Sequence, residues 1–353
     1  MGAGTNNPLS GGGGTQVLLR LCCEGHNGIV NAVTWSPDSR YVASAGDDQT
    51  IQVWDSSVGA TFVTHVNEFS STVWSPVDNR IASAAMGGKV QIWDAVTGTR
   101  LVTYTGHPGT SSVTSINWSP DAKQIVSASK DGTILIWNVA TGTTIASYAG
   151  HGQTITGLTW LPGGKRIALV DSKGMVQMGN VTKGRILLTP QKQLAGVNTI
   201  SWSPDGRRVA VVDLSGQVQV WDAITGKVLL APLAQLQGVQ GIAWSPDGRQ
   251  IASGGNGKFQ VWDAATGKLL FTELGSVYLI STISWAPDGK HLAFTSAYGV
   301  EVWNITIATL LLTYRGVNWN AAPSMAAVSW SPDGKRIAST DSGAAYVWLA
   351  LTE

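Results

Sequence analysis

A tryptophan repeat constrains this chain of 353 residues more than any other feature. A Trp, usually followed by a turn of the Ser-Pro-Asp-Gly type, recurs at intervals of 39 to 45 residues, at Trp35, Trp74, Trp118, Trp160, Trp202, Trp244, Trp285 and Trp330. A second Trp follows 18 or 19 residues later in seven repeats, at Trp54, Trp93, Trp137, Trp221, Trp262, Trp303 and Trp348. The fourth repeat lacks this second Trp, and we place Met178 at its position. A period of about 40 residues indicates a repeat architecture.

Each repeat has the pattern of four short strands. In the third repeat, the runs Val113–Trp118, Gln124–Ser129, Thr133 to Trp137 and Thr144–Tyr148 are separated by segments rich in Pro, Asp, Asn and Gly. These residue types favour tight turns for distinct conformational reasons. A four-stranded meander of about 42 residues is typical of a propeller blade. We therefore predict an all-β fold, an eight-bladed β-propeller of four-stranded antiparallel blades.

The two chain ends complement one another. The last repeat stops at residues 349–353, just after its third strand, while residues 17–26 match the fourth strand and the Gly-His ending of other repeats. An N-terminal strand that completes the C-terminal blade would close the ring and remove free sheet edges. We predict one propeller over residues 15–353. Residues 1–14, with six glycines, are predicted to form a flexible tail.

Two sequence signatures that recur at matching positions of the repeats indicate a family resemblance. Trp-Asp pairs end the third strand at Trp54-Asp55, Trp93-Asp94, Trp221-Asp222 and Trp262-Asp263, and Gly-His pairs lead into blades at Gly25-His26, Gly106-His107 and Gly150-His151. The chain therefore resembles the WD40-repeat β-propeller family, in the style of bacterial WD40 proteins. Its Trp-Ser-Pro-Asp-Gly half is also similar to Tol-type and prolyl-peptidase-type propellers, which usually lack the Trp-Asp half.

The resemblance implies a structural role for the repeated histidines. It implies hydrogen-bonded sets that join a His, a Ser, an Asp and the second Trp of a blade, here His26, Ser44, Asp48 and Trp54, and His107, Ser127, Asp131 and Trp137. Such buried networks stabilise a fold only when every member is satisfied. The fourth repeat departs most, with Leu161-Pro162-Gly163-Gly164 for its turn and Met178-Gly179-Asn180 for Trp-Asp. Its divergence indicates drift, or alternatively a partner site.

Composition excludes several classes of protein. The 23 basic and 22 acidic residues give a net charge of +1, so a nucleic-acid partner is not indicated. No run approaches 18 apolar residues, so no membrane-spanning helix is expected. The Gly-rich start has no apolar block of the kind a secretory signal needs. A cytoplasmic location is the default expectation, and export of a longer precursor stays open.

Signatures of catalysis are also missing from the sequence. It contains no Gly-x-Ser-x-Gly elbow, no His-Glu-x-x-His pair and no phosphate-binding loop that ends in Gly-Lys-Ser or Gly-Lys-Thr. The repeated histidines stand a blade apart, so they do not converge on one metal ion. We expect no enzyme activity, no cofactor and no metal.

Loops at one end of the ring are the expected binding surface, because rigid blades hold them in place. In the family, this end carries the loop leading into each blade and the turn between its second and third strands. The matching positions are Asn67, Glu68, Phe69, Lys130, Lys173, Tyr278, Leu279, Tyr298, Asn318, Trp319 and Asn320. Trp319 is the strongest candidate, because it alone among 16 Trp has no repeat role and Trp is enriched in binding hot spots. Alternatively, Trp319 covers the channel mouth as a plug.

Three functions remain open at this level. The first is a non-catalytic interaction scaffold that binds a protein or peptide. The second is a self-associating structural unit, which forms homo-oligomers or filaments through its N-terminal tail, since low charge weakens the repulsion between copies. The third, less favoured, is a small-molecule binder or hydrolase that uses the channel.

Overall fold

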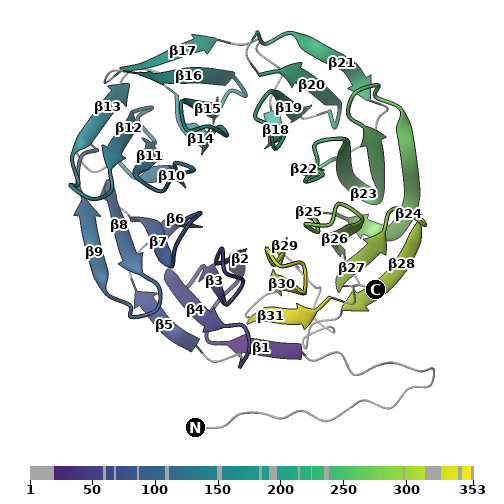
Figure 1. Cartoon of the computed structure of the whole chain (residues 1–353), viewed down its shortest axis with the longest axis horizontal. Coiled ribbons are helices and arrows are strands. Elements are labelled where there is room, and N and C mark those ends of the chain that lie inside the picture. The colour runs from purple at the N-terminus through teal and green to yellow at the C-terminus, as the bar shows by residue number, and fades with distance from the viewer. Residues whose placement is uncertain are drawn as a thin grey trace.

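A closed ring of β-sheets makes up the protein in the computed structural model (Figure 1). The structure describes residues 20–58, 61–66, 69–85, 87–107, 111–148, 153–182, 185–190, 197–213, 215–223, 225–233, 238–280, 282–296, 299–314, 327–340 and 344–350. In these ranges every regular element is a strand, and none is a helix. The prediction of an all-β, eight-bladed propeller is therefore confirmed.

The strands follow one another around the ring in chain order. They are β1 (Arg20–Glu24), β2 (Val30–Trp35), β3 (Tyr41–Gly46), β4 (Thr50–Asp55), β5 (Thr61–Val66), β6 (Phe69–Trp74), β7 (Arg80–Ala85), β8 (Lys89–Asp94), β9 (Arg100–Tyr104), β10 (Val113–Trp118), β11 (Gln124–Ser129), β12 (Ile134–Asn138), β13 (Thr144–Tyr148), β14 (Ile155–Trp160), β15 (Arg166–Asp171), β16 (Val176–Thr182), β17 (Arg185–Pro190), β18 (Val197–Trp202), β19 (Arg208–Asp213), β20 (Val218–Asp222), β21 (Val228–Leu233), β22 (Gly241–Trp244), β23 (Gln250–Asp263), β24 (Leu269–Leu279), β25 (Ile283–Trp285), β26 (His291–Ser296), β27 (Gly299–Asn304), β28 (Thr309–Tyr314), β29 (Val328–Trp330), β30 (Arg336–Thr340) and β31 (Ala344–Leu349).

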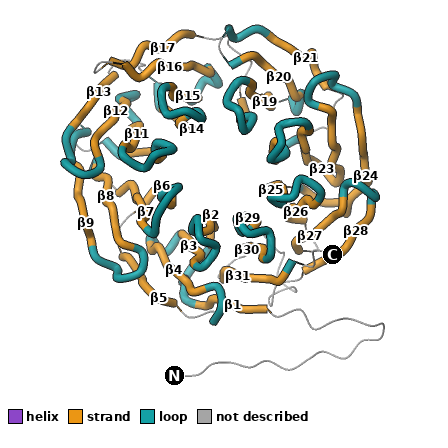
Figure 2. Tube along the Cα trace, in the orientation of Figure 1, coloured by secondary structure: helices purple, strands orange, loops and turns teal. Residues whose placement is uncertain are grey.

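Each blade is an antiparallel meander that runs outward from the channel. Blades one to seven begin at β2, β6, β10, β14, β18, β22 and β25, which lie innermost in Figure 1. Because neighbouring strands alternate in direction, the turns after the first and third strands share one end of the ring. Figure 2 looks onto that end, which we call the turn face, and shows these loops around the channel. The turns after the second strands and the connections between blades lie at the opposite end.

Blade eight combines both ends of the chain. Its sheet has the order β29, β30, β31 and then β1. Strand β1 pairs antiparallel with β31 from Arg20 opposite Trp348 to Glu24 opposite Ala344. The outer edge of the C-terminal blade is thus covered by N-terminal backbone, so this edge has a hydrogen-bonding partner.

Blade six departs from the predicted four separate strands, because β23 spans the length of two. Its first half pairs with β22 and its second half with β24. The two halves meet at Gly-Gly-Asn-Gly, residues 254–257, where blades one, three, four and five have an Asp-containing turn. A side chain at Gly254 would lie 2.6 Å from Ile280, so glycine allows β23 to approach closely the chain that follows β24.

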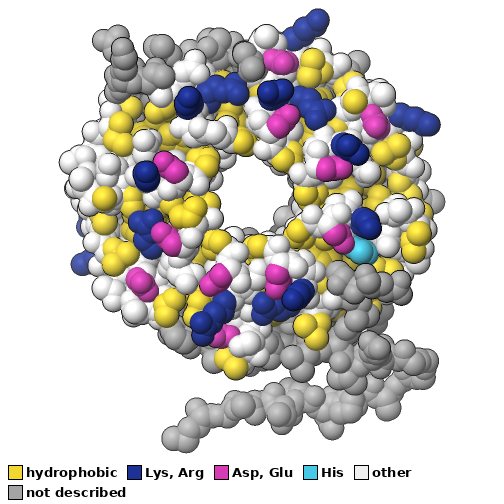
Figure 3. Space-filling model, viewed as in Figure 1, with side chains coloured by type: hydrophobic (Ala, Val, Ile, Leu, Met, Phe, Trp, Pro, Cys, Tyr) yellow, Lys and Arg dark blue, Asp and Glu magenta, His cyan; other side chains and the backbone are white. Residues whose placement is uncertain are grey.

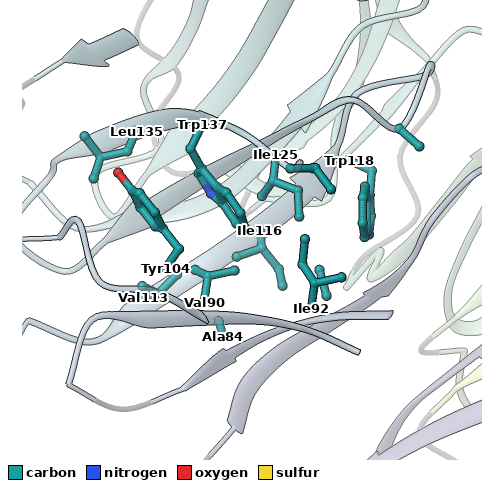
Figure 4. Packing of buried hydrophobic residues seen from close by; sticks show 13 residues of the cluster. Ala84, Val90, Ile92, Tyr104, Val113, Ile116, Trp118, Ile125, Leu135 and Trp137 are labelled. Carbon is teal, nitrogen blue, oxygen red and sulfur yellow. The ribbon is translucent and has the colours of Figure 1, made fainter. Parts of the chain in front are cut away.

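The hydrophobic core lies between neighbouring blades. One cluster joins Ile92 and Tyr104 of blade two to Ile116, Trp118 and Trp137 of blade three, all buried (Figure 4). The second and third strands of a blade are almost fully buried, as in β11 and β12, whereas outer strands such as β9 are largely exposed. Each blade therefore buries its apolar faces only by contact with its neighbours, as in other repeat architectures.

Candidate functional site

The His26 set of blade one forms a connected hydrogen-bond network. Ser44 Oγ lies 2.7 Å from His26 Nε2 and accepts a hydrogen bond from Trp54 Nε1 at 2.8 Å. On the other side of the imidazole, Nδ1 lies 3.0 Å from both carboxylate oxygens of Asp48 and 3.0 Å from Thr50 Oγ1. The ring is therefore held on both nitrogens, which fixes it as a structural group inside the blade.

Asp48 is the anionic member of this network. Burial by itself would raise the pKa of its carboxyl. Hydrogen bonds from the Asn27 amide, His26 and Thr50 outweigh that effect, and the pKa lies below its ordinary value. The Asn27 amide donates to Asp48 Oδ2 at 2.8 Å, which ties the connection between blades to the turn after β3. Asp48 thus links two loops at the end opposite the turn face.

The corresponding set of blade three is only partly bonded. His107 Nε2 lies 2.7 Å from Ser127 Oγ, but His107 Nδ1 and Trp137 Nε1 are buried and have no hydrogen-bond partner among the described residues. Asp131 instead accepts hydrogen bonds from Ser129 Oγ and the Thr133 amide. Burial lowers the pKa of His107 to about 4, against the opposing attraction of Asp131, so the ring is neutral at pH 7.

Blades without such a His still provide a hydrogen-bond acceptor for the indole N–H of the second Trp. In blades six and eight the indole donates to a Ser hydroxyl of the second strand, at 3.1 Å for Trp262 and 2.9 Å for Trp348. In blade five Trp221 donates to Gln219 at 3.1 Å. In blade seven the acceptor is the buried carboxylate of Glu301, at 3.2 Å from Trp303.

Blade four lacks the second Trp altogether, and the strand register corrects the expectation for Met178. Ile167 of β15 lies opposite Gly179, just as Val209 of β19 lies opposite Trp221 in blade five. Gly179, not Met178, therefore occupies the Trp position, because the turn after β15 keeps the longer spacing. This is also the blade whose outer strand β17 makes a parallel pairing with β13 of blade three, at Ser147 opposite Arg185.

The Ser-Pro-Asp-Gly motif builds the turn face and also joins the blades. In blade five Ser203 Oγ donates to Asp205 at 2.6 Å and accepts from the Arg208 amide at 2.9 Å. Gly206 has φ +64°, and a side chain there would lie 2.6 Å from Pro162 of blade four. Glycine is thus required both by the turn and by the proline of the preceding blade.

A cationic contact between blades was missed by the sequence analysis. Arg80, Arg208 and Arg336, each six residues after a first Trp, place their guanidinium groups 5.1, 4.7 and 5.3 Å from the ring centres of Trp118, Trp244 and Trp35 in the next blade. Arg336 also donates to the Ser39 carbonyl at 2.7 Å. The constant spacing of six residues was the available signal. These contacts combine cation–π attraction with hydrogen bonding across blade boundaries.

Most of the predicted binding residues lie outside the described structure. This holds for Asn67, Glu68, Tyr298, Asn318, Trp319 and Asn320, and for the side chains of Phe69, Tyr278 and Leu279. Lys130 and Lys173 are described, and both are exposed in turns after the second strand. The two lysines belong to neighbouring blades, three and four, at the end opposite the turn face.

The described residues contain no group of three or more His, Cys, Asp or Glu placed to hold a metal ion. Within the same ranges, no helix is long and apolar enough to span a membrane. A groove of about 410 Å³ opens on the turn face across blades two, three and four, lined by Val73, Trp74, Pro76, Asn117, Trp118, Pro120, Trp160 and Pro162. Its size is that of a small ligand pocket.

Comparison with known proteins assigns the class. The family model "WD domain, G-beta repeat" matches residues 17–55, 57–94, 98–138, 186–222 and 231–263, more than half of the chain. The protein belongs to the WD40-repeat family.

Individual relatives agree with this class. The small ribosomal subunit protein RACK1y of Oryza sativa subsp. japonica is 51% identical over 45 residues, which span 13% of either protein. The computationally designed protein Ika8 superimposes with a TM-score of 0.78 at 24% identity, over 93% of this chain and 98% of that one. The C-terminal WD40 domain of Sif2 superimposes with a TM-score of 0.79 at 17% identity, over 96% of this chain and 100% of that domain. At these identities the two structures show the fold alone.

Proposed function

We propose that the protein is a non-catalytic interaction scaffold that binds a protein or peptide partner. The observation that carries the proposal is the use of the repeated polar side chains. His26, Asp48 and Ser44 bond within one blade, and the turn carboxylates bond their own turns. These polar groups already have hydrogen-bond partners within their own blade or turn. They support a rigid platform and are not arranged as a reaction centre.

Membership of the WD40 family supports a partner of protein nature, since this fold is typical of interaction scaffolds. The rice relative is named as a component of the small ribosomal subunit, which is an assembly context for that protein. For this chain, the loops opposite the turn face are the proposed contact surface. We assign the leading role on this surface to Trp319, with further contacts made by Tyr278, Tyr298 and the exposed Lys130 and Lys173.

Paired baits test this proposal. The full chain and a Trp319→Ala variant are used to capture proteins from the source cells, with Lys335→Ala on the turn face as the matched control. We expect one protein to be enriched by the full chain and by Lys335→Ala, and to be lost with Trp319→Ala. The Kd of the purified partner should rise at least about tenfold for Trp319→Ala, as for a hot-spot residue.

The result that overturns the proposal is a partner that binds all three baits equally, or no enriched partner. Light scattering over a wide concentration range then tests self-association as the alternative. Oligomers formed by the full chain, and not by a chain that starts at Thr15, would make the protein a structural unit that assembles through its tail.

A further inference from the structure

Blade four differs most from the other blades in the acidic residues of the turn face. The first turn contains an Asp in every blade except four, and an Asp directly follows the second Trp in blades one, two, five and six, whereas blades seven and eight have Asn304 and Leu349 there. Blade four has Gly163 in place of the Asp of the first turn, and Asn180 in place of the Asp that follows the second Trp. Blade three has Asn138 in place of the Asp that follows the second Trp. Three acidic positions are thus neutral in two adjacent blades.

The basic residues of this sector are kept. Lys123 and Lys165 are exposed, and Arg166 is half-buried at the start of β15. Among the described residues, no carboxylate lies within ion-pair distance of Lys165 or Arg166, whereas Arg80 of blade two lies 2.7 Å from Asp78. Figure 3 shows Lys and Arg side chains gathered without acidic neighbours over the blade of β14–β17. Asp121 is the one acidic residue in these two turns, so the sector keeps a net positive charge at neutral pH.

The groove on the turn face is lined by residues from the same turns as two of these cations. Pro120 and Pro162 form part of its lining, and each stands three residues before a lysine, Lys123 or Lys165, in the same turn. All of its lining residues are uncharged, and they include the first Trp of three successive blades. A largely apolar groove thus lies on the turn face in the sector that carries Lys123 and Lys165.

We propose that this sector of blades two to four binds an acidic peptide segment of a partner protein, with an apolar side chain of that segment seated in the groove. The inference rests on the proposed scaffold function and assigns a second contact surface at the other end of the ring. Charge complementarity selects the acidic flanks, and the uncharged lining selects the apolar anchor. A nucleic acid fits less well, because it has no aliphatic side chain to fill the uncharged, largely apolar groove.

A fluorescent synthetic peptide provides the test. The probe carries Glu residues on both sides of a Leu-Pro pair, and its controls replace Glu by Lys or Leu by Ala. Binding to the full chain is measured by fluorescence anisotropy at low and high salt. The Lys123→Glu/Lys165→Glu double variant is compared with Lys290→Glu/Lys335→Glu, which changes the same turn position in blades seven and eight. Unfolding curves check that both variants fold, and a Lys→Gln pair replaces any that does not.

We expect the Glu peptide to bind, the Lys peptide not to bind, and the Ala peptide to bind at least about fivefold more weakly. The Lys123→Glu/Lys165→Glu variant should raise the Kd about tenfold or more, and the control pair less than about threefold. No binding, equal weakening by both variants, or tighter binding of a single-stranded RNA of matched charge would overturn the proposal. Partner loss with Trp319→Ala is read separately, so the scaffold function and this site can fail independently.

Discussion

Blades one and four have the same four-stranded fold, but the interior of blade one is polar and that of blade four is hydrophobic. Blade one centres on a polar network in which Trp54, 1% exposed, shares the Ser44 hydroxyl with His26. In blade four the matching positions are Gly179 and Leu169, and the interior is a hydrophobic cluster, largely aliphatic but with Trp160, packed against blade three. A blade in a closed ring therefore needs buried contact with its neighbours, while the means of filling its centre can change.

The two blades also differ at the turn face. Blade one keeps Asp38 and Asp55 there, and blade four has neither counterpart. Hydrogen bonds from Ser203 and Ser245 lower the pKa of Asp205 and Asp247 in the regular turns, so those carboxylates stay ionised and balance nearby cations. Blade four lacks both carboxylates. Its stability therefore depends more on packing, and its turn face carries less negative charge.

Alanine at the second-Trp position should separate the two blades most strongly. Trp54→Ala is expected to lower the free energy of unfolding by about 3–5 kcal/mol, because a large buried side chain is lost. Gly179→Ala should change it by less than about 1 kcal/mol, because a strand glycine has no packing to lose. Urea unfolding followed by tryptophan fluorescence and circular dichroism measures both. Equal effects would show that the two positions are not equivalent in packing.

The hydrogen-bond network of blade three is only partly formed, and we expect acid to destabilise the protein through this blade. The unfolded chain binds a proton at His107 near its ordinary pKa of 6.5, and the folded chain only near 4. The unfolded state therefore holds more protons between these values. The free energy of unfolding should fall as the pH drops from 6.5 to 4, by up to about 3 kcal/mol.

The control for this prediction is a His107→Gln variant measured beside the native chain. Their difference in stability should depend on pH only in that window. A constant difference from pH 7.5 to pH 4 would contradict the assignment of a neutral, buried imidazole.

The smallest effect is expected from the shared hydroxyl. Ser44→Ala removes the acceptor of Trp54 Nε1 and the partner of His26 Nε2, and should cost about 2 kcal/mol. Ser83→Ala in blade two, where the hydroxyl accepts from Trp93 at 3.0 Å, should cost about 1 kcal/mol. Thermal unfolding of both variants measures the difference. A larger loss for Ser83→Ala would reverse the ranking of the two sites.

Much of the architecture could be predicted because the repeat is visible in residue types that the fold needs. First Trp residues such as Trp118 fill the space between blades, and Gly206 permits a turn that other residues would strain. Register was harder to predict. The spacing between the first and the second Trp varies by one residue among the blades. Only the pairing of Ile167 with Gly179 therefore decides which residue of blade four stands at the position of the second Trp.

Contacts between blades could not be predicted from local patterns. The stacking of Arg208 on Trp244 depends on how two sheets are rotated against each other, although its spacing recurs along the chain. The charged sector of blades three and four also emerges only when turns 42 residues apart are placed side by side. Local sequence determines each turn, and the ring determines which turns are neighbours.

The pairing of β1 with β31 has a consequence during protein synthesis. Glu24 and its partner Ala344 are separated by 320 residues of chain, so Ala344 is synthesised long after Glu24. Blades one to seven can pack against one another as the chain grows, but blade eight cannot be completed before β31 is made. Contacts between such distant residues are slow to form, and an unpaired edge is prone to aggregation. The growing ring therefore stays open, with the pairing edge of β1 unoccupied, until β31 has been synthesised.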